Sequence, residues 1–297
     1  MRGNLRQRHI GVIALAPLAI LFLGIACNPT NSGKRSGNSK PNTNQAPSSQ
    51  NFLANLPAGL AIPNREDEVG WRVLSDYGAV LVARGGAVAP PFVVFPDAQA
   101  VDRWQAGLKT MRTDLGGTRI ELQTPAMTAL MEARTEAQTS HLSITPRGSD
   151  AGRRTYEETV ELWASRVNPG LEHWTQEGRL TQAEAARIRN LSPREQIPEV
   201  LRLEKGGIYF SKDFAKSILY SVAAPGTSQH LSMLAFDVKE YDDASVRAIL
   251  ARHGWFQTVS SDTPHFTFLG VAEGDLPSLG LKKTTNAGRV FWVPRLD

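Results

Sequence analysis

The order of apolar and polar residues in the first part of the folded chain predicts strands and one helix. Three short runs, at 79–84, 92–95 and 118–122, are rich in apolar residues and are bounded by Gly, Pro or polar residues, as strands usually are. Between the second and third runs, residues 97–108 place apolar side chains every three or four positions, which is the spacing of an amphipathic helix. We expect residues 52–121 to form a small α+β subdomain in which no chemistry is recognisable.

Better-marked helices are predicted in the remainder of the chain. Residues 154–167 carry apolar side chains at helical spacing. The segments 181–184 and 192–195 read TQAE and SPRE, and both fit a capping box, in which a hydroxyl and a glutamate satisfy each other's backbone N–H groups. A further helix is expected over 242–254, with Gly254 at its C-terminal end.

In two segments, apolar residues recur at every second position rather than at every third or fourth. Residues 232–238 alternate in this way, and residues 265–270 form a second candidate strand. Helices and strands occur in blocks rather than in strict alternation, which favours an α+β fold with an antiparallel sheet flanked by helices.

The N-terminus has the layout of an export signal. Three arginines lie within the first ten residues, and an uncharged apolar run of 17 residues follows, ending directly before Cys27. Because Cys27 is the only cysteine in the chain, residues 1–27 resemble a bacterial lipoprotein signal, in which this cysteine is lipidated. The alternative is an uncleaved membrane anchor, since 17 residues is at the lower limit for a span. Both interpretations place residues 28–297 outside the cytoplasm.

A polar segment separates this signal from the folded part. Residues 28–51 contain no large apolar side chain, so they cannot bury enough surface to offset chain entropy. We expect a disordered tether here, and hence a membrane-anchored lipoprotein of the bacterial cell envelope.

The net charge of +4 comes from the N-terminal segment rather than from the folded part. Residues 1–50 contain six positive and no negative side chains, so removing them leaves a charge of −2 for residues 51–297. A nucleic-acid partner requires a clustered basic surface, and the sequence argues against one.

Candidate chemistry lies on the two segments with a period of two. If residues 232–238 are extended, Asp237 projects to the face opposite the apolar side chains, and His230 lies at the entrance to the same strand. If the second strand pairs with the first, His265 reaches the same side of the sheet. Two imidazoles and a carboxylate suffice to bind zinc, with a fourth position left for water. Asp262 lies three residues before His265 and has no apolar neighbour that would suggest core packing.

These residues resemble a known family pattern. The segment PGTSQHLSMLAFD is similar to the Ser-x-His-x-x-Gly-x-Ala-x-Asp signature of VanY-type zinc D-alanyl-D-alanine carboxypeptidases, with Ser228, His230, Ala235 and Asp237 matching. Their wider clan includes lysostaphin-like endopeptidases and the hedgehog signalling domain. The segment SDTPHFTFLG is similar to the family's second motif, Glu-x-Trp-His followed by an aromatic strand.

The resemblance implies a zinc peptidase domain over residues 122–297, with a hedgehog/DD-peptidase-like fold. It implies that Zn²⁺ is held by the three residues already named and that peptidoglycan stem peptides are the substrate. Asp262 takes the place of the catalytic acid, Arg147 that of the arginine that binds the substrate's carboxylate, and Ser228 that of a substrate contact.

Three positions depart from the family pattern. Met233 replaces Gly, Pro264 replaces Trp, and Asp262 replaces Glu, which shortens the catalytic side chain by one methylene. The sequence therefore leaves two alternatives to a D,D-carboxypeptidase: a weak or inactive cell-wall-binding lipoprotein of the same fold, and a D,D- or L,D-endopeptidase.

Overall fold

The computed structural model describes residues 51–297. The expectations for the signal, for lipidated Cys27 and for the tether up to residue 50 lie outside the described residues. Within the described part, no helix is both long enough and apolar enough to cross a membrane.

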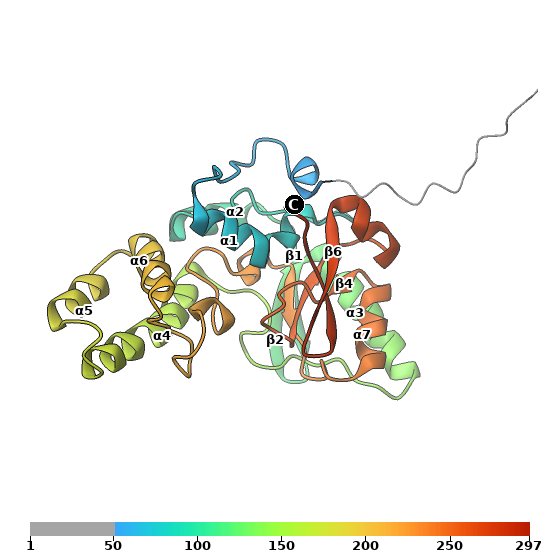
Figure 1. Cartoon of the computed structure of the whole chain (residues 1–297). Coiled ribbons are helices and arrows are strands. Elements are labelled where there is room, and N and C mark those ends of the chain that lie inside the picture. Colours follow the sequence, from blue (N-terminus) through green and yellow to red (C-terminus); the bar gives the residue numbers. More distant parts are fainter. Residues whose placement is uncertain (1–50) are drawn as a thin grey trace, which may run out of the picture. The chain divides into compact units, whose positions relative to one another are not determined.

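The described chain contains seven α-helices and seven strands (Figure 1). The helices are α1 (Glu68–Tyr77), α2 (Ala98–Ala106), α3 (Thr124–Thr139), α4 (Tyr156–Gln176), α5 (Gln182–Arg189), α6 (Pro193–Lys205) and α7 (Ala244–Arg252). The strands are β1 (Thr110–Leu115), β2 (Thr118–Gln123), β3 (Ala235–Asp237), β4 (Trp255–Phe256), β5 (His265–Phe268), β6 (Leu281–Asn286) and β7 (Arg289–Pro294). Short 3₁₀ helices are η1 (Phe52–Asn55), η2 (Gly78–Val82), η3 (Ile218–Tyr220), η4 (Gln229–Ser232) and η5 (Glu273–Leu279).

All strand pairing is antiparallel, so the α+β expectation is confirmed. The strands form two hairpins, β1-β2 and β6-β7, and a three-stranded sheet in the order β3-β5-β4. In that sheet Asp237 lies directly opposite His265, and Phe236 lies opposite Phe266. The register therefore brings two of the predicted metal ligands side by side.

The sheet packs on helices α3 and α7 through a fully apolar layer. Phe236, Trp255 and Phe266 are buried, together with Leu130 from α3 and Leu250 from α7. Burial of large apolar side chains is the main stabilising contribution to such a layer. This layer fixes the sheet, and with it the backbone positions of Asp237 and His265.

Helices α4, α5 and α6 pack on one another around a second core (Figure 1). Trp163 on α4 is buried there, and its Nε1 donates to Gln196 Oε1 at 2.8 Å. The two predicted capping boxes begin α5 and α6, and a third, formed by Thr155 and Glu158, begins α4. We refer to α4–α6 as the helical wall, because α4 faces the site described below.

Residues 52–121 do not have a core of their own. Phe52, Leu74 and Ile120 belong to the same buried cluster as Phe236 and Trp255. The boundary expected at residue 121 thus falls inside strand β2, and one shared core lies on both sides of it.

Two of the expected strands are absent. Residues 79–82 lie in η2, and residues 92–95 form no regular element. Residues 79–83 are all buried. A short run that is buried on all sides shows no alternation of apolar and polar residues, so the sequence does not distinguish a strand from a helix there. At Phe95 the backbone N–H donates to the carbonyl of Gly226 at 2.9 Å, so this segment pairs with a loop rather than with a strand.

The predicted strand at 232–238 is shorter than expected. It begins at Ala235, because Gln229–Ser232 form η4 and Met233 adopts a left-handed conformation with φ 54°. A residue with a side chain pays a steric cost in this conformation, whereas glycine does not. The turn explains why Gly occupies this position in the family pattern.

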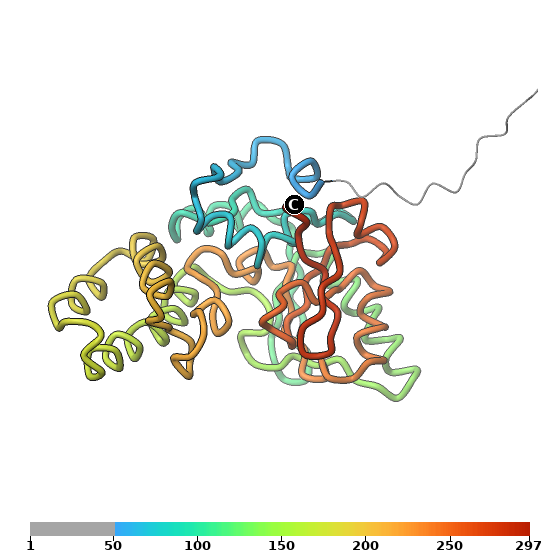
Figure 2. The backbone as a smooth tube through the Cα atoms, viewed as in Figure 1, coloured from blue at the N-terminus to red at the C-terminus, as the bar shows by residue number. Residues whose placement is uncertain are grey.

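The C-terminal hairpin was not predicted. Strands β6 and β7, dark red in Figure 2, join at Ala287 and Gly288, which have φ 48° and 74°. Positive φ at both central residues is typical of the two-residue turns that fit twisted hairpins. The N–H of Trp292 donates to the carbonyl of Gln257 at 2.9 Å, which ties the hairpin to the segment after β4.

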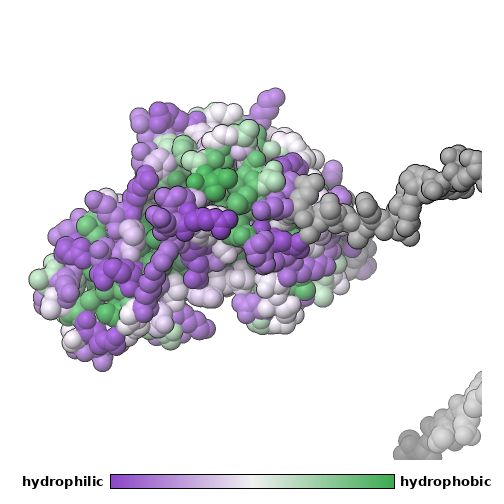
Figure 3. All heavy atoms as spheres, turned by 45° about the horizontal axis from the view of Figure 1, so that its top comes forward, coloured by the Kyte–Doolittle hydropathy of each residue, from purple (hydrophilic) through white to green (hydrophobic). Residues whose placement is uncertain are grey.

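The face shown in Figure 3 is largely polar, with a large green hydrophobic area near the upper centre and smaller ones at the left. Large apolar side chains that remain exposed among the described residues include Ile62, Val88 and Phe92.

Candidate metal centre

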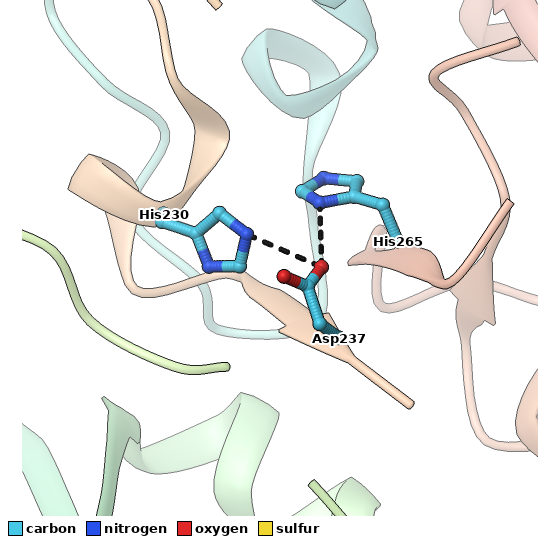
Figure 4. A group of neighbouring side chains, drawn as sticks. All are labelled: His230, Asp237 and His265. Atoms are coloured by element: carbon cyan, nitrogen blue, oxygen red, sulfur yellow. Dashed lines mark hydrogen bonds and ion pairs between the residues drawn. The ribbon is translucent and has the colours of Figure 1, made fainter. Parts of the chain in front are cut away.

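Three side chains from three elements converge on one point (Figure 4). His230 comes from η4, Asp237 from the end of β3, and His265 from the start of β5. Asp237 Oδ1 lies 3.3 Å from His230 Nε2 and 3.1 Å from His265 Nδ1. All three donor atoms lie within 4.8 Å of one another, as the sequence predicted for these residues.

The spacing of these atoms matches a tetrahedral metal site. Zinc binds imidazole nitrogen and carboxylate oxygen at roughly 2.0–2.2 Å, so two ligands in a tetrahedron lie roughly 3.3 Å apart. The two distances from Asp237 Oδ1 fall at this value. The residues present therefore fit a zinc ion with three protein ligands and one open position.

Hydrogen bonds fix which nitrogen of each histidine faces the cluster. His230 Nδ1 lies 2.6 Å from the carbonyl oxygen of Gly152, which can only accept, so this nitrogen carries the proton. His265 Nε2 lies 2.9 Å from Gln229 Oε1. Gln229 is itself oriented, because its Nε2 donates to the carbonyl of Tyr77 at 2.8 Å. The inward nitrogens, His230 Nε2 and His265 Nδ1, are thus left with lone pairs, as metal ligands require.

The cluster places an ionised carboxylate between two buried imidazoles. Burial lowers the pKa of His230, against the opposing attraction of Asp237, so the neutral imidazole is preferred. Burial alone would raise the pKa of Asp237, but the adjacent His230 and His265 hold it well below its usual range. Two lone pairs and an anionic oxygen then face one another in a buried position, and a divalent cation is the group that relieves this repulsion.

Arg154 holds the other oxygen of Asp237. Its Nη2 lies 3.3 Å from Asp237 Oδ2 and 2.9 Å from Asp150 Oδ2. The capping box of α4 begins at the next residue, Thr155, and fixes the chain there. The salt bridge leaves Oδ1 of Asp237 turned toward the two imidazoles.

A cavity of about 230 Å³ opens beside the cluster. His230, His265 and Ser228 line one side of it, and Asp262 lies at its edge. The opposite side is formed by one stripe of the helical wall, with the residues Thr159, Leu162 and Arg166. A peptide bond placed in this cavity would lie between the cluster and α4.

Asp262 and Ser228 lie in the cavity, as a catalytic acid and a substrate contact would. The residue Asp262 as a whole is exposed, whereas its carboxyl is largely surrounded by protein atoms. This desolvation raises the pKa of Asp262, although the nearby His265 opposes the shift. Ser228 is buried and directly precedes η4. Their roles remain predictions that these positions allow.

Arg147 is not brought to the cavity. Its backbone N–H donates to the carbonyl of Asp237 at 2.9 Å, but its side chain is exposed and lies over the ring of Tyr241. The two arginines that line the cavity are Arg154 and Arg166. The role expected for Arg147 is therefore not supported by its position.

Sequence reasoning missed Arg154, Arg166 and Gln229. Gln229 is adjacent to His230 in the motif, and its buried amide connects His265 with Thr258 and Thr267. Arg154 stands directly before a Thr-x-x-Glu capping box, a signal that could have located it at a rigid helix start. The side chain of Arg166 could not be placed from spacing alone.

Comparisons with known proteins found little. No family model and no curated protein matches the chain. A solved structure of the vancomycin resistance D,D-pentapeptidase VanY, a mutant from a VanB-type cassette in complex with Zn(II), is 18% identical with a TM-score of 0.34, covering 56% of this chain and 82% of the other. VanYB in complex with D-alanine-D-alanine is 16% identical with a TM-score of 0.35, covering 59% and 86%. Similarity at this level assigns no family to the chain.

Proposed function

We propose that the protein is a zinc-dependent peptidase that hydrolyses D-Ala-D-Ala or related bonds in peptidoglycan stem peptides. One observation carries the proposal. Three donor atoms, His230 Nε2, Asp237 Oδ1 and His265 Nδ1, lie within 4.8 Å of one another, with the two imidazole nitrogens 3.3 and 3.1 Å from the carboxylate oxygen, beside a cavity that also contains a carboxyl group. The stem-peptide substrate follows from the motif resemblance and from the predicted export signal.

A zinc ion held by His230, Asp237 and His265 would supply a water of lowered pKa and would polarise a carbonyl oxygen. Asp262 takes the proton from the attacking water and passes it to the leaving amine, because it is the carboxyl that lines the cavity without belonging to the cluster. Its raised pKa suits both steps, since it accepts a proton more readily than an ordinary aspartate.

Arg154 and Ser228 assist the reaction through contacts with the substrate in the cavity. The guanidinium of Arg154 lies beside the cluster and lines the cavity, so its charge favours negative charge that develops on the scissile oxygen. Ser228 presents its side chain to the same cavity, where it contacts the substrate backbone.

The test combines metal analysis with a digest of muropeptides. The purified protein is expected to contain close to one zinc ion per chain and to release D-alanine from pentapeptide muropeptides. A chelator should stop the release, and added zinc should restore it. Protein that binds no zinc would overturn the metal assignment, and zinc-loaded protein that releases no amino acid and splits no peptide would overturn the activity.

A second candidate function is favoured by one feature. The side chain of Asp262 is one methylene shorter than the glutamate of the family pattern, which withdraws its carboxylate by about 1.5 Å. Such a displacement can reduce a rate by on the order of a hundredfold. A cell-wall-binding lipoprotein of the same fold would retain muropeptide binding without turnover. An endopeptidase would instead split cross-linked dimers into monomers in the same digest.

A further inference from the structure

Arg166 lines the cavity from the helical wall and has no acidic partner. It forms no ion pair with any residue in the described range 51–297. No acidic side chain on α4 is in position to pair with it, since the residues three and four positions away are Leu162, Trp163, Pro169 and Gly170. A positive charge that is partly buried without a counter-ion is costly unless a ligand supplies one.

The proline in α4 explains the position of the guanidinium. Pro169 has no N–H, so the carbonyl of Ser165, four residues earlier, lacks its helical donor. Arg166 Nη1 donates to this carbonyl at 3.3 Å and to Ser165 Oγ at 3.0 Å. One edge of the guanidinium is thus held by the helix itself.

The other edge is free. Arg166 Nε is buried and has no hydrogen-bond partner among the described residues. Nε and Nη2 lie on the same edge of the planar guanidinium and together form the fork that binds a carboxylate through two parallel hydrogen bonds. The Nε of Arg154 is also buried without a hydrogen-bond partner, but its fork is not free, because its Nη2 is already engaged by Asp237 and Asp150.

The position of Arg166 along α4 gives the direction of the substrate. Thr159, Leu162 and Arg166 form one stripe at i, i+3 and i+7, and all three line the cavity. The stripe runs for about 10 Å, at about 1.5 Å per residue. Arg154 pairs with Asp237 and so lies beside the metal cluster. Arg166 lies farther from the start of α4 than Thr159 and Leu162 do.

We propose that Arg166 forms a carboxylate subsite, which selects peptides that carry a free carboxylate close to the scissile bond. This inference rests on the proposed peptidase function and names the substrate class of the same site. The carboxylate can be the C-terminal one of the leaving residue, or one on the acyl side of the bond, such as the α-carboxylate of a γ-linked glutamate.

The experiment uses three synthetic stem pentapeptides with the zinc-loaded protein. The first carries both carboxylates, the second is amidated at its C-terminus, and the third is amidated at the glutamate α-carboxylate. Arg166→Gln should weaken binding of the first peptide by about ten- to a hundredfold, which is the range for a hydrogen-bonded charge. One of the two amidated peptides should bind the variant and the wild type with equal affinity. The carboxylate that is amidated in that peptide is the one that Arg166 binds.

Arg166→Lys keeps the charge but loses the fork, so it should bind the first peptide with intermediate affinity. Arg189→Gln removes the same charge from α5, outside the cavity, and serves as the matched control with unchanged binding. Zinc content and thermal unfolding of Arg166→Gln establish that the variant is folded.

Affinity is measured by calorimetry with both arginine forms in an Asp262→Asn background, which should keep its zinc and lose hydrolysis, so the peptides are not consumed during the titration. If the wild type binds the first peptide without cleaving it, the proposed activity fails while the subsite is still tested. Equal losses of affinity for all three peptides, no loss for any, or no binding of the first peptide by the zinc-loaded wild type would overturn the subsite.

Discussion

The two sides of the cavity are built on opposite principles. On the sheet side, the outward nitrogens of His230 and His265 and the second oxygen of Asp237 are each engaged by a hydrogen-bond or ion-pair partner, so the inward atoms have one possible orientation. On the helical wall, Arg166 keeps a buried nitrogen without any partner. The sheet side is suited to hold a resident ion of fixed geometry, and the helical wall is suited to receive a group that comes and goes.

The largest effect is expected on the sheet side, from loss of a donor. His230→Ala removes one of three protein ligands, so the protein should lose most of its bound zinc. Zinc per chain is measured by elemental analysis after gel filtration. His253→Ala is the matched control, since His253 lies at the end of α7 against Glu136 and should leave the zinc content unchanged. Full zinc occupancy in His230→Ala would show that the cluster is not the metal site.

Removing the carboxyl at the cavity edge should separate metal binding from chemistry. Asp262→Asn is expected to keep its zinc and to lose about 10²–10⁴-fold in the rate of hydrolysis. In the wild type, Asp262 must be ionised to accept a proton. Its raised pKa means that activity should decline as pH falls, starting at a higher pH than for an ordinary aspartate. The residual activity of Asp262→Asn should not show this decline at low pH. If the decline is unchanged in the variant, another group carries out the proton transfer.

A smaller effect is expected from the residue that orients His265. Gln229→Met removes the amide oxygen that accepts from His265 Nε2 while keeping a similar volume. Loss of such a supporting hydrogen bond typically reduces metal affinity by about ten- to a hundredfold. Competition with a chromogenic chelator measures the zinc affinity. Gln176→Met, at an exposed position of α4, is the control, and equal affinities in the two variants would remove Gln229 from the metal site.

The smallest effect should be confined to the helical wall. Thr181→Ala removes the hydroxyl that accepts from the backbone N–H of Glu184 at the start of α5. Loss of such a cap should lower the free energy of unfolding by about 1 kcal/mol, as measured by urea denaturation. Zinc affinity should not change. A loss of zinc affinity would mean that the two sides of the cavity are not independent.

The features that could be predicted from the sequence are those fixed by local chemistry. The capping boxes at Thr181 and Ser192 begin helices as expected, because each satisfies its own backbone groups within four residues. The convergence of the three donors could also be predicted, because pairing of two short strands is enough to align Asp237 with His265.

The remaining features depend on the path of the chain in three dimensions. Residues 79–83 are all buried, so their sequence does not distinguish a strand from the 3₁₀ helix η2 that is present. The arginines between residues 147 and 154 are equivalent in sequence. The backbone N–H groups of Arg147 and Arg154 both donate to carbonyls of ligand residues, Asp237 and His230, but of these two arginines only Arg154 lines the cavity. Which arginine faces the cavity was therefore not visible in the spacing.

The hydrogen bond from Gln229 to the carbonyl of Tyr77 has a wider consequence. Tyr77 is the last residue of α1, so a segment that donates no ligand and carries no reactive group still sets the angle of an imidazole in the metal centre. A truncated chain that begins at residue 122 would contain all three candidate ligands and yet lose one of the hydrogen bonds that orient Gln229, and through it His265. The geometry of the candidate metal site thus depends on the polypeptide from α1 onward.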